Sequence, residues 1–235
     1  MTAPGAAPAT LAEAMIAVLK SCGVRFLFGV PGGGSSLDLI AAADKAGMEF
    51  ILCRGETAAA LSASVAAELT GAPGVVLTAI GPGAASAVNG MAYAHLERAP
   101  LLLISDSREA GEAVPPHQVF DLQALFRPLA KACVRLAPDT GAAQFADLVA
   151  LTLRPPEGPV FVELSANDAA RNVSLEVPSG RMTESGDPPA ADISSAAHNI
   201  LAESRRPILL IGLQAARPEL SAGLLQFGER LGCPI

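Results

Sequence analysis

The sequence predicts an α/β fold, with a parallel six-stranded sheet covered by helices on both faces and the beginning of a second α/β unit behind it. Three observations support this prediction. Short apolar segments alternate with amphipathic ones over about 165 residues, a length usual for one domain. Gly-rich turns stand where a strand would pass into a helix. The composition, 51% hydrophobic and 17% charged, allows a large buried core.

The predicted strands are apolar along their whole length, which is typical of parallel strands buried on both faces. They lie at 24–30, 49–53, 74–80, 100–105, 131–136 and 159–164. The predicted helices lie at 11–22, 35–45, 56–69, 84–97, 121–125 and 140–153. Thr10 and Glu13 form a capping box for the first helix, and Ser35 and Ser36 are candidates to cap the second.

The first domain is predicted to span residues 1–173. Residues 174–190 are rich in Pro, Gly and Ser and indicate a linker. Residues 191–235 then predict a helix, one strand at 207–212 and a second helix. One strand and two helices cannot build a core of their own. We therefore expect an incomplete domain, which a longer polypeptide or a partner chain would complete.

Charge and motif content argue against several classes of function. The net charge of −7 is the wrong sign for binding nucleic acid or anionic lipid. The uncharged stretch between Glu68 and Glu97 is interrupted by Pro and Gly and offers no apolar run of the ~20 residues that span a bilayer. Residues 1–9 lack the features of a signal peptide, which predicts a cytoplasmic location. Neither the four cysteines nor the three histidines have the spacing of metal ligands, so no metal site is predicted.

Three segments that follow the first three strands are candidates for a ligand site. They are residues 31–34, 55–56 and 81–83. In an open parallel sheet, ligands bind beyond the carboxyl ends of the strands. Glycine lets a ligand approach the backbone, so a flat or anionic small molecule would fit. No GxGxxG or Walker motif is present. The alternatives are that these glycines only form tight turns and that Glu56 only stabilises a helix dipole.

Five segments in this order, although each is short, resemble the pyrimidine-binding domain of thiamine-diphosphate enzymes, above all the acetolactate synthases. They are residues 28–33, 54–59, 71–75, 81–84 and 126–131. The beginning of a Rossmann-like central domain after the linker also fits this family. The resemblance implies an enzyme that decarboxylates a 2-oxo acid, ligates the product to a second carbonyl compound, or does both. Pyruvate is the default substrate under this interpretation.

The resemblance also implies a role for Glu56. A glutamate at this place hydrogen-bonds N1′ of the cofactor aminopyrimidine and favours the imino tautomer, which deprotonates the thiazolium C2. Gln118 matches an active-site glutamine, nine residues before Arg127, although His117 and Gln118 could equally form a solvated loop. Gly33 would approach the substrate.

The turn Gly81, Pro82 and Gly83 would pack near the pyrimidine under this resemblance, or else be a purely structural turn. The sequence departs from the family at Gly55, where relatives commonly have His. It also contains no Gly-Asp-Gly motif. Thiamine diphosphate would therefore need Mg²⁺ bound by a domain absent from this chain. FAD would bind, if at all, in the complete enzyme.

The resemblance further implies an active site shared between subunits, either in a homodimer or tetramer or with a separate diphosphate-domain subunit. The chain alone is not expected to turn over substrate. Two rival interpretations remain open. The chain could be the pyrimidine-domain subunit of a split 2-oxo acid decarboxylase, or a non-catalytic binding module that keeps the fold.

Overall fold

The computed structural model describes residues 9–108, 117–136, 141–173, 191–213, 215–216 and 218–234. The chain divides into two compact units between residues 184 and 185. The predicted linker at 174–190 lies outside the described residues. The two units are described separately below.

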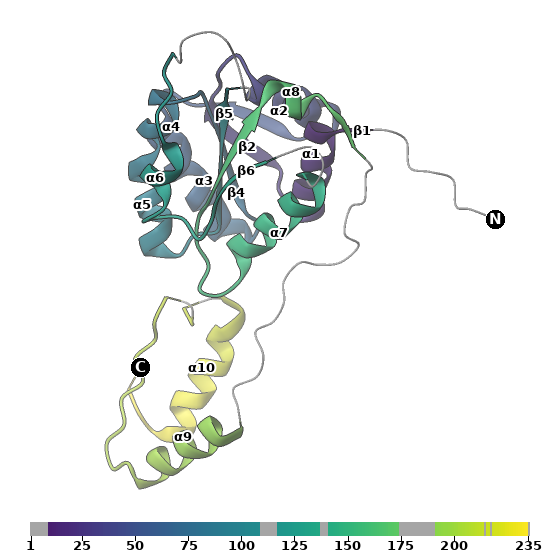
Figure 1. The fold of residues 1–235 in the computed structure, drawn as a ribbon. Coiled ribbons are helices and arrows are strands. Elements are labelled where there is room, and N and C mark those ends of the chain that lie inside the picture. The colour runs from purple at the N-terminus through teal and green to yellow at the C-terminus, as the bar shows by residue number, and fades with distance from the viewer. Residues whose placement is uncertain are drawn as a thin grey trace, which may run out of the picture. The chain divides into compact units, whose positions relative to one another are not determined.

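The larger unit is built on a parallel six-stranded sheet, as predicted (Figure 1). The strands are β2 (Phe26–Val30), β3 (Glu49–Leu52), β4 (Gly74–Thr78), β5 (Leu101–Ser107), β6 (Cys133–Arg135) and β7 (Val160–Ser165). Their order across the sheet is β3-β2-β4-β5-β7-β6, and each neighbouring pair is parallel. A separate antiparallel pair joins β1 (Ala9–Thr10) to β8 (Asn172–Val173).

Helices cover both faces of the sheet. One face carries α1 (Leu11–Ser21), α2 (Ser35–Lys45), α7 (Gly141–Leu153) and α8 (Ala166–Ala169). The other carries α3 (Glu56–Thr70), α4 (Pro82–Ser86), α5 (Val88–Glu97) and α6 (Leu122–Phe126). Alternate side chains of each strand enter the two cores: Val75 and Leu77 of β4 face the first group, and Val76 faces the second. The sheet is therefore buried on both sides.

The predicted helix at 84–97 is wrong as a single element, because it is interrupted at Ala87 and divides into α4 and α5. Two hydrogen bonds explain the break. The Ser86 hydroxyl donates to the Pro82 carbonyl at 2.9 Å, a local bond that competes with regular helix geometry. The Ser86 carbonyl accepts from the Thr57 hydroxyl at 2.5 Å. The end of α4 is thereby tied to α3.

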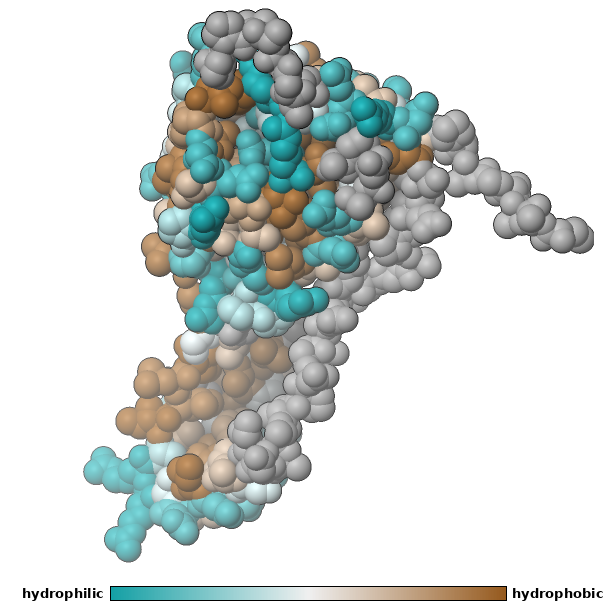
Figure 2. Space-filling view, in the orientation of Figure 1, coloured by the Kyte–Doolittle hydropathy of each residue, from teal (hydrophilic) through white to brown (hydrophobic). Residues whose placement is uncertain are grey.

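The smaller unit contains α9 (Ala191–Glu203) and α10 (Pro218–Leu231), both predicted. The predicted strand at 207–212 is wrong: the structure describes these residues and assigns no strand to them. A strand needs a neighbouring strand for its ladder. In the described residues the Leu209 N–H donates to the Pro234 carbonyl at 3.1 Å, and Pro234 belongs to no strand. Leu210 is 92% exposed. Figure 2 shows apolar residues gathered on this unit, and no sheet covers them among the described residues.

Candidate functional site

The turns that follow β2, β3 and β4 lie together at the carboxyl edge of the sheet. Strand β2 pairs with both of the others, with Gly29 opposite Leu52 and Val30 opposite Thr78. The three segments named from the sequence, 31–34, 55–56 and 81–83, therefore leave the sheet side by side. This is the edge where open parallel sheets bind ligands.

Glu56 is the first residue of α3 and is partly buried. Gly55 before it is fully extended, with φ of −178° and ψ of 155°, and gives α3 no side-chain cap. The Glu56 carboxylate points toward the turn after β4: its Oε1 lies 3.4 Å from the point where a Cβ at Gly83 would stand. In the part of the chain that the structure describes, this carboxylate has no hydrogen bond or ion pair. It is thus available to a ligand.

The turn after β4 requires glycine at position 81 and leaves little room for a side chain at position 83. Gly81 has φ of +60°, a conformation that side chains with a Cβ rarely adopt. A Cβ there would also overlap the Gln118 carbonyl oxygen. At Gly83 a Cβ would stand 3.0 Å from the Cβ of Ala79, besides crowding Glu56. The Gly81 to Gly83 turn is thus held between Glu56 on one side and the Gln118 backbone on the other.

Gln118 is exposed and, unusually for a residue other than glycine, has φ of +58°. Its contact with Gly81 places it beside the same turn that Glu56 faces. The neighbouring Val119 and Phe120 are 46% and 47% exposed. The structure therefore brings Gln118, Gly81, Gly83 and Glu56 together, although they are far apart in the sequence.

Asp106, which the sequence analysis did not single out, organises the turn after β2. It lies near the end of β5 and is only 6% exposed. Its carboxylate accepts hydrogen bonds from the backbone N–H of Gly34 (3.1 Å) and of Ser36 (2.7 Å). The hydroxyls of Ser35 (2.9 Å) and Ser36 (3.1 Å) also donate to it. The sequence signal was an acidic residue just after the apolar run Leu101–Ile104, separated from it only by Ser105.

This arrangement corrects the expectation that Ser35 and Ser36 cap α2. The N-cap is Gly34, which has no side chain, and Asp106 supplies the capping carboxylate from another strand. The Gly34 N–H before α2 and the Ser36 N–H in its first turn are therefore bound to Asp106 and are not free to bind an anionic ligand at that turn. Burial, with a smaller contribution from the charge of Asp106, raises the pKa of Asp38 in the first turn of α2.

The three glycines of this turn differ in what requires them. A Cβ at Gly32 would overlap Oδ2 of Asp106, and one at Gly34 would stand 3.1 Å from its Cγ. Gly33, by contrast, is exposed, has no positive φ, and has nothing within 4 Å of its Cβ position. Neither packing nor backbone conformation in the described residues requires glycine at 33. Gly33 is therefore the position in the turn that a ligand could approach.

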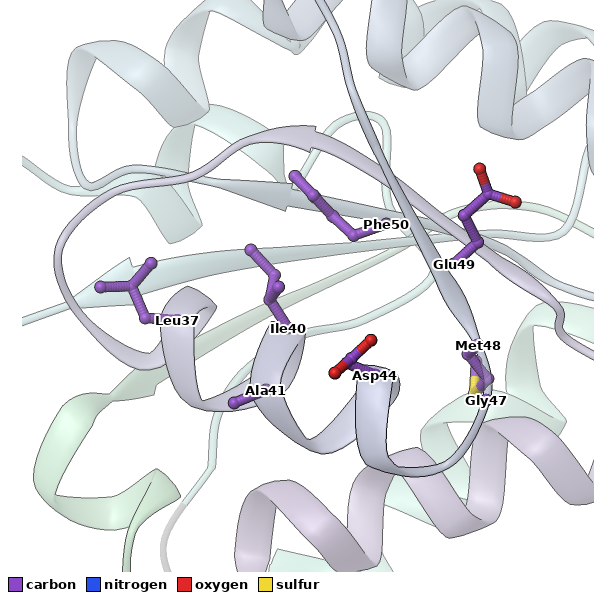
Figure 3. Close-up of a pocket in the computed structure, with 8 residues that line it drawn as sticks. All are labelled: Leu37, Ile40, Ala41, Asp44, Gly47, Met48, Glu49 and Phe50. Atoms are coloured by element: carbon purple, nitrogen blue, oxygen red, sulfur yellow. The ribbon is translucent and has the colours of Figure 1, made fainter.

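A separate groove runs between α2 and the edge strand β3 (Figure 3). Its lining residues are Leu37, Ile40, Ala41, Asp44, Gly47, Met48, Glu49 and Phe50. In Figure 3 the side chains of Ile40 and Phe50 project from helix and strand into this groove. It includes none of the candidate site residues.

The described residues form neither a metal cluster nor a membrane-spanning helix. Within them, no group of three or more His, Cys, Asp or Glu side chains is placed to hold a metal ion. No described helix combines the length and the apolar character needed to cross a bilayer.

Comparison with known proteins identifies the family. Residues 9–125 match the family described as thiamine pyrophosphate enzyme, N-terminal TPP binding domain. The chain belongs to the thiamine pyrophosphate enzymes. This matched region contains Gly33, Glu56, the turn from Gly81 to Gly83, and Gln118. The family assignment made from five short segments of sequence is confirmed.

Two relatives illustrate the range of the family. The chain is 31% identical over 220 residues to the catabolic acetolactate synthase of Raoultella terrigena, covering 91% of this chain and 38% of that enzyme. It is 31% identical over 261 residues to 2-hydroxyacyl-CoA lyase 2 of Bos taurus, covering 94% of this chain and 41% of that enzyme. The chain thus spans about two fifths of the length of these thiamine pyrophosphate enzymes.

A solved structure supports the fold. The thiamine diphosphate-dependent 4-hydroxybenzoylformate decarboxylase of Rhodococcus jostii RHA1 matches with a TM-score of 0.79 at 21% identity. The match covers 96% of this chain and 44% of that one.

Proposed function

We propose that the complete protein is a thiamine-diphosphate-dependent, acetolactate synthase-like lyase or transferase that decarboxylates a 2-oxo acid, and that this chain holds the pyrimidine end of the cofactor. The observation that carries the proposal is the Glu56 carboxylate. It is partly buried at the carboxyl edge of the sheet, faces Gly83, and has no partner in the described part of the chain. A carboxyl group so placed suits a ring nitrogen that must share a proton.

The residues at the carboxyl edge of the sheet would have different roles. Thiamine diphosphate, when bound, would supply a nucleophilic thiazolium carbon and an electron sink for the decarboxylation. Glu56 shares its proton with N1′ of the aminopyrimidine and so sets the tautomer of that ring. Gly81, Pro82 and Gly83 form the backbone surface beside the ring, where a side chain at Gly83 would crowd the Glu56 carboxylate. Gly33 and Gln118 stand at the substrate side.

Gly55 makes this version of the site simpler than that of relatives with His at this position. The extended backbone at Gly55 has no special requirement for glycine, and nothing lies within 4 Å of its Cβ position. The residue before Glu56 therefore contributes no proton donor. We expect Glu56 to act without help from this neighbour.

The anionic end of the cofactor and its Mg²⁺ would be held outside this chain, in a domain of the same polypeptide or on another subunit. Two N–H groups at the start of α2, those of Gly34 and Ser36, are bound to Asp106, in keeping with this arrangement. We propose a homo-oligomer, because α3 and α5 together expose Leu69 (81%) and Leu96 (70%). Sedimentation of the complete polypeptide as a monomer would contradict this assembly.

The test compares Glu56→Gln with Glu68→Gln in the complete polypeptide, loaded with thiamine diphosphate and Mg²⁺. Both glutamates lie on α3, and Glu68 is exposed and accepts only the Tyr93 hydroxyl in the described structure. We expect Glu56→Gln to slow both exchange of the thiazolium C2 proton for deuterium and decarboxylation by at least about 100-fold. Glu68→Gln should match the wild type. Full activity of Glu56→Gln would refute the proposal.

The same assay addresses the substrate. Pyruvate is the first candidate, because acetolactate synthases are among the relatives. A 2-hydroxyacyl-CoA is the second, because a lyase of that name is equally similar. Turnover of the thioester without turnover of any 2-oxo acid would favour the lyase reaction.

A further inference from the structure

Asp106 holds the turn that carries Gly33 from both sides. On the far side of Gly33, the carboxylate accepts the N–H of Gly34 directly. On the near side, the Gly32 N–H donates to the Ser36 hydroxyl at 3.1 Å, and that hydroxyl donates to Asp106 Oδ2 at 3.1 Å. Gly33 is the one residue of the turn left exposed between these two attachments.

The glycines beside Gly33 follow from the same carboxylate. A Cβ at Gly32 would overlap Oδ2 of Asp106, and a Cβ at Gly34 would stand tightly against its Cγ, as described above. The turn is therefore shaped around Asp106. In the described structure the hydrogen-bond partners of the Asp106 carboxylate are all uncharged: two backbone N–H groups and two hydroxyls. Several short hydrogen bonds to one buried carboxylate fix a turn far more rigidly than the glycines themselves would.

We infer that Asp106 is a positioning residue that, through Ser36 and the Gly34 backbone, fixes the Gly33 turn against the ligand bound at the carboxyl edge. The inference rests on the proposed function, and it adds a residue that acts from the opposite side of the sheet to Glu56. Asp106 faces α2, as do Leu102 and Ile104 of the same strand, whereas Glu56 begins α3 on the other face. The two faces of the sheet thus have separate roles. Glu56 on one face acts on the protonation of the bound ring, and Asp106 on the other fixes the position of the Gly33 turn.

Ser35 and Ser36 provide a matched pair for the test. Both hydroxyls donate to Asp106. Only the Ser36 hydroxyl also accepts the Gly32 N–H, whereas the Ser35 hydroxyl is within 2.8 Å of the Leu164 carbonyl, away from the turn. Ser36→Ala therefore removes the hydroxyl that links the Gly32 N–H to Asp106. Ser35→Ala also removes a hydroxyl that donates to Asp106, but that hydroxyl makes no bond to the Gly33 turn in the described structure. Asp106→Asn should be the more disruptive variant, because its side-chain NH₂ group would face the N–H and hydroxyl donors that now bind the carboxylate.

The experiment uses the complete polypeptide. Without cofactor, amide hydrogen exchange is measured at residues 32–36 by NMR. With thiamine diphosphate and Mg²⁺, C2 proton exchange is measured together with kcat and KM for the 2-oxo acid that the wild type decarboxylates. We expect faster amide exchange at Gly32 in Ser36→Ala and at Gly34 in Asp106→Asn. We expect kcat to fall about 10- to 100-fold in both, with C2 exchange within about twofold of the wild type, since Glu56 is untouched. Ser35→Ala should keep its kcat.

The outcomes separate the two proposals. If the wild type exchanges C2 and turns over substrate, but Ser36→Ala and Ser35→Ala show equal kcat values, the positioning role is refuted and the proposed function stands. Loss of C2 exchange together with kcat in Ser36→Ala would also refute it, because the whole site would then have been disturbed. If the wild type itself neither exchanges C2 nor turns over any substrate, both proposals fail. Should Asp106→Asn not fold, the serine pair decides.

Discussion

Gly90 on α5 faces Ala60 on α3 so closely that a single methyl group should force the two helices apart. The three atoms nearest to a Cβ built at Gly90 all belong to Ala60, whose own Cβ would lie well inside 3.0 Å, with its C and Cα at 3.2 Å. Carbon atoms pack at about 3.5–4.0 Å, so the helices must separate by more than about 1 Å. No rotamer change can relieve the contact, because both methyl groups are fixed to the backbone.

Two effects oppose each other in Gly90→Ala. Overpacking of a well-packed core costs about 1–3 kcal/mol, and a backbone-fixed clash belongs at the upper end. Alanine gains about 1 kcal/mol over glycine in helix propensity. The clash wins, and we expect the free energy of unfolding to fall by about 2 kcal/mol, from the difference between these two magnitudes. The melting temperature should fall by about 4–8 °C for a domain of this size.

The rescue is Ala60→Gly, which removes the opposing methyl group. Alone it should destabilise by about 1 kcal/mol through helix propensity. In the double variant the overlap of the two methyl groups disappears, only the 3.2 Å contacts with the backbone of residue 60 remain, and the two propensity changes cancel, so most of the lost stability should return. Urea and thermal unfolding of the four proteins would measure this coupling. Destabilisations that simply add, or a Gly90→Ala variant as stable as the wild type, would refute the packing argument.

Two further predictions concern charged side chains. Burial, and to a lesser extent the charge of Asp106, raises the pKa of Asp38. The folded state therefore binds the Asp38 proton more tightly than the unfolded state does. The free energy of unfolding should fall as pH rises above the ordinary aspartate pKa. Asp38→Asn should therefore stabilise the domain at neutral pH and lose this advantage in acid; urea unfolding that gives the same difference at both pH values would contradict this. The Lys131 ammonium donates to the carbonyls of Leu151 (2.6 Å), Arg154 (2.6 Å) and Pro156 (2.8 Å) at the end of α7, so Lys131→Met should lower the free energy of unfolding by about 1–3 kcal/mol. The control Lys45→Met breaks only an exposed ion pair with Glu13 in the described structure and should cost less than about 1 kcal/mol; equal losses in the two variants would show that the carbonyl cluster adds no stability.

The placement of Glu56 could be predicted because its signals are local. A strand, a glycine and then a helix that begins with a carboxylate occupy only a few neighbouring positions, and periodicity and propensity act over that range. The capping box of Thr10 and Glu13 was found for the same reason, and both of its hydrogen bonds are present, at 3.0 and 3.1 Å. By the same local reasoning, however, 84–97 was expected to be one helix, because nothing nearby indicated that Thr57 would bind the Ser86 carbonyl.

The strand expected at 207–212 shows a different limit. Its apolar residues have the composition of a buried strand, but composition does not supply a neighbour with which to pair. In the described residues of the smaller unit there is none, and the segment remains without a ladder. A β-strand forms only when a second segment pairs with it. The apolar pattern of one segment therefore predicts a strand only where such a partner exists.

The alternation of strands and helices, the parallel sheet, and the edge where the Gly-rich turns and Glu56 lie could all be predicted before the structure was known. These follow from burial patterns and turn chemistry, which short stretches of chain contain. Three contacts could be seen only in the folded chain. Asp106 binds the N–H groups of Gly34 and Ser36 at the start of α2. Gly33 has no neighbour at its Cβ position, and the Gln118 backbone lies against Gly81. Asp106 lies 70 residues from Ser36 in the chain. Such contacts exist only after the parallel strands have aligned. The pairing of β2 with β4, and of β4 with β5, brings the distant loops together.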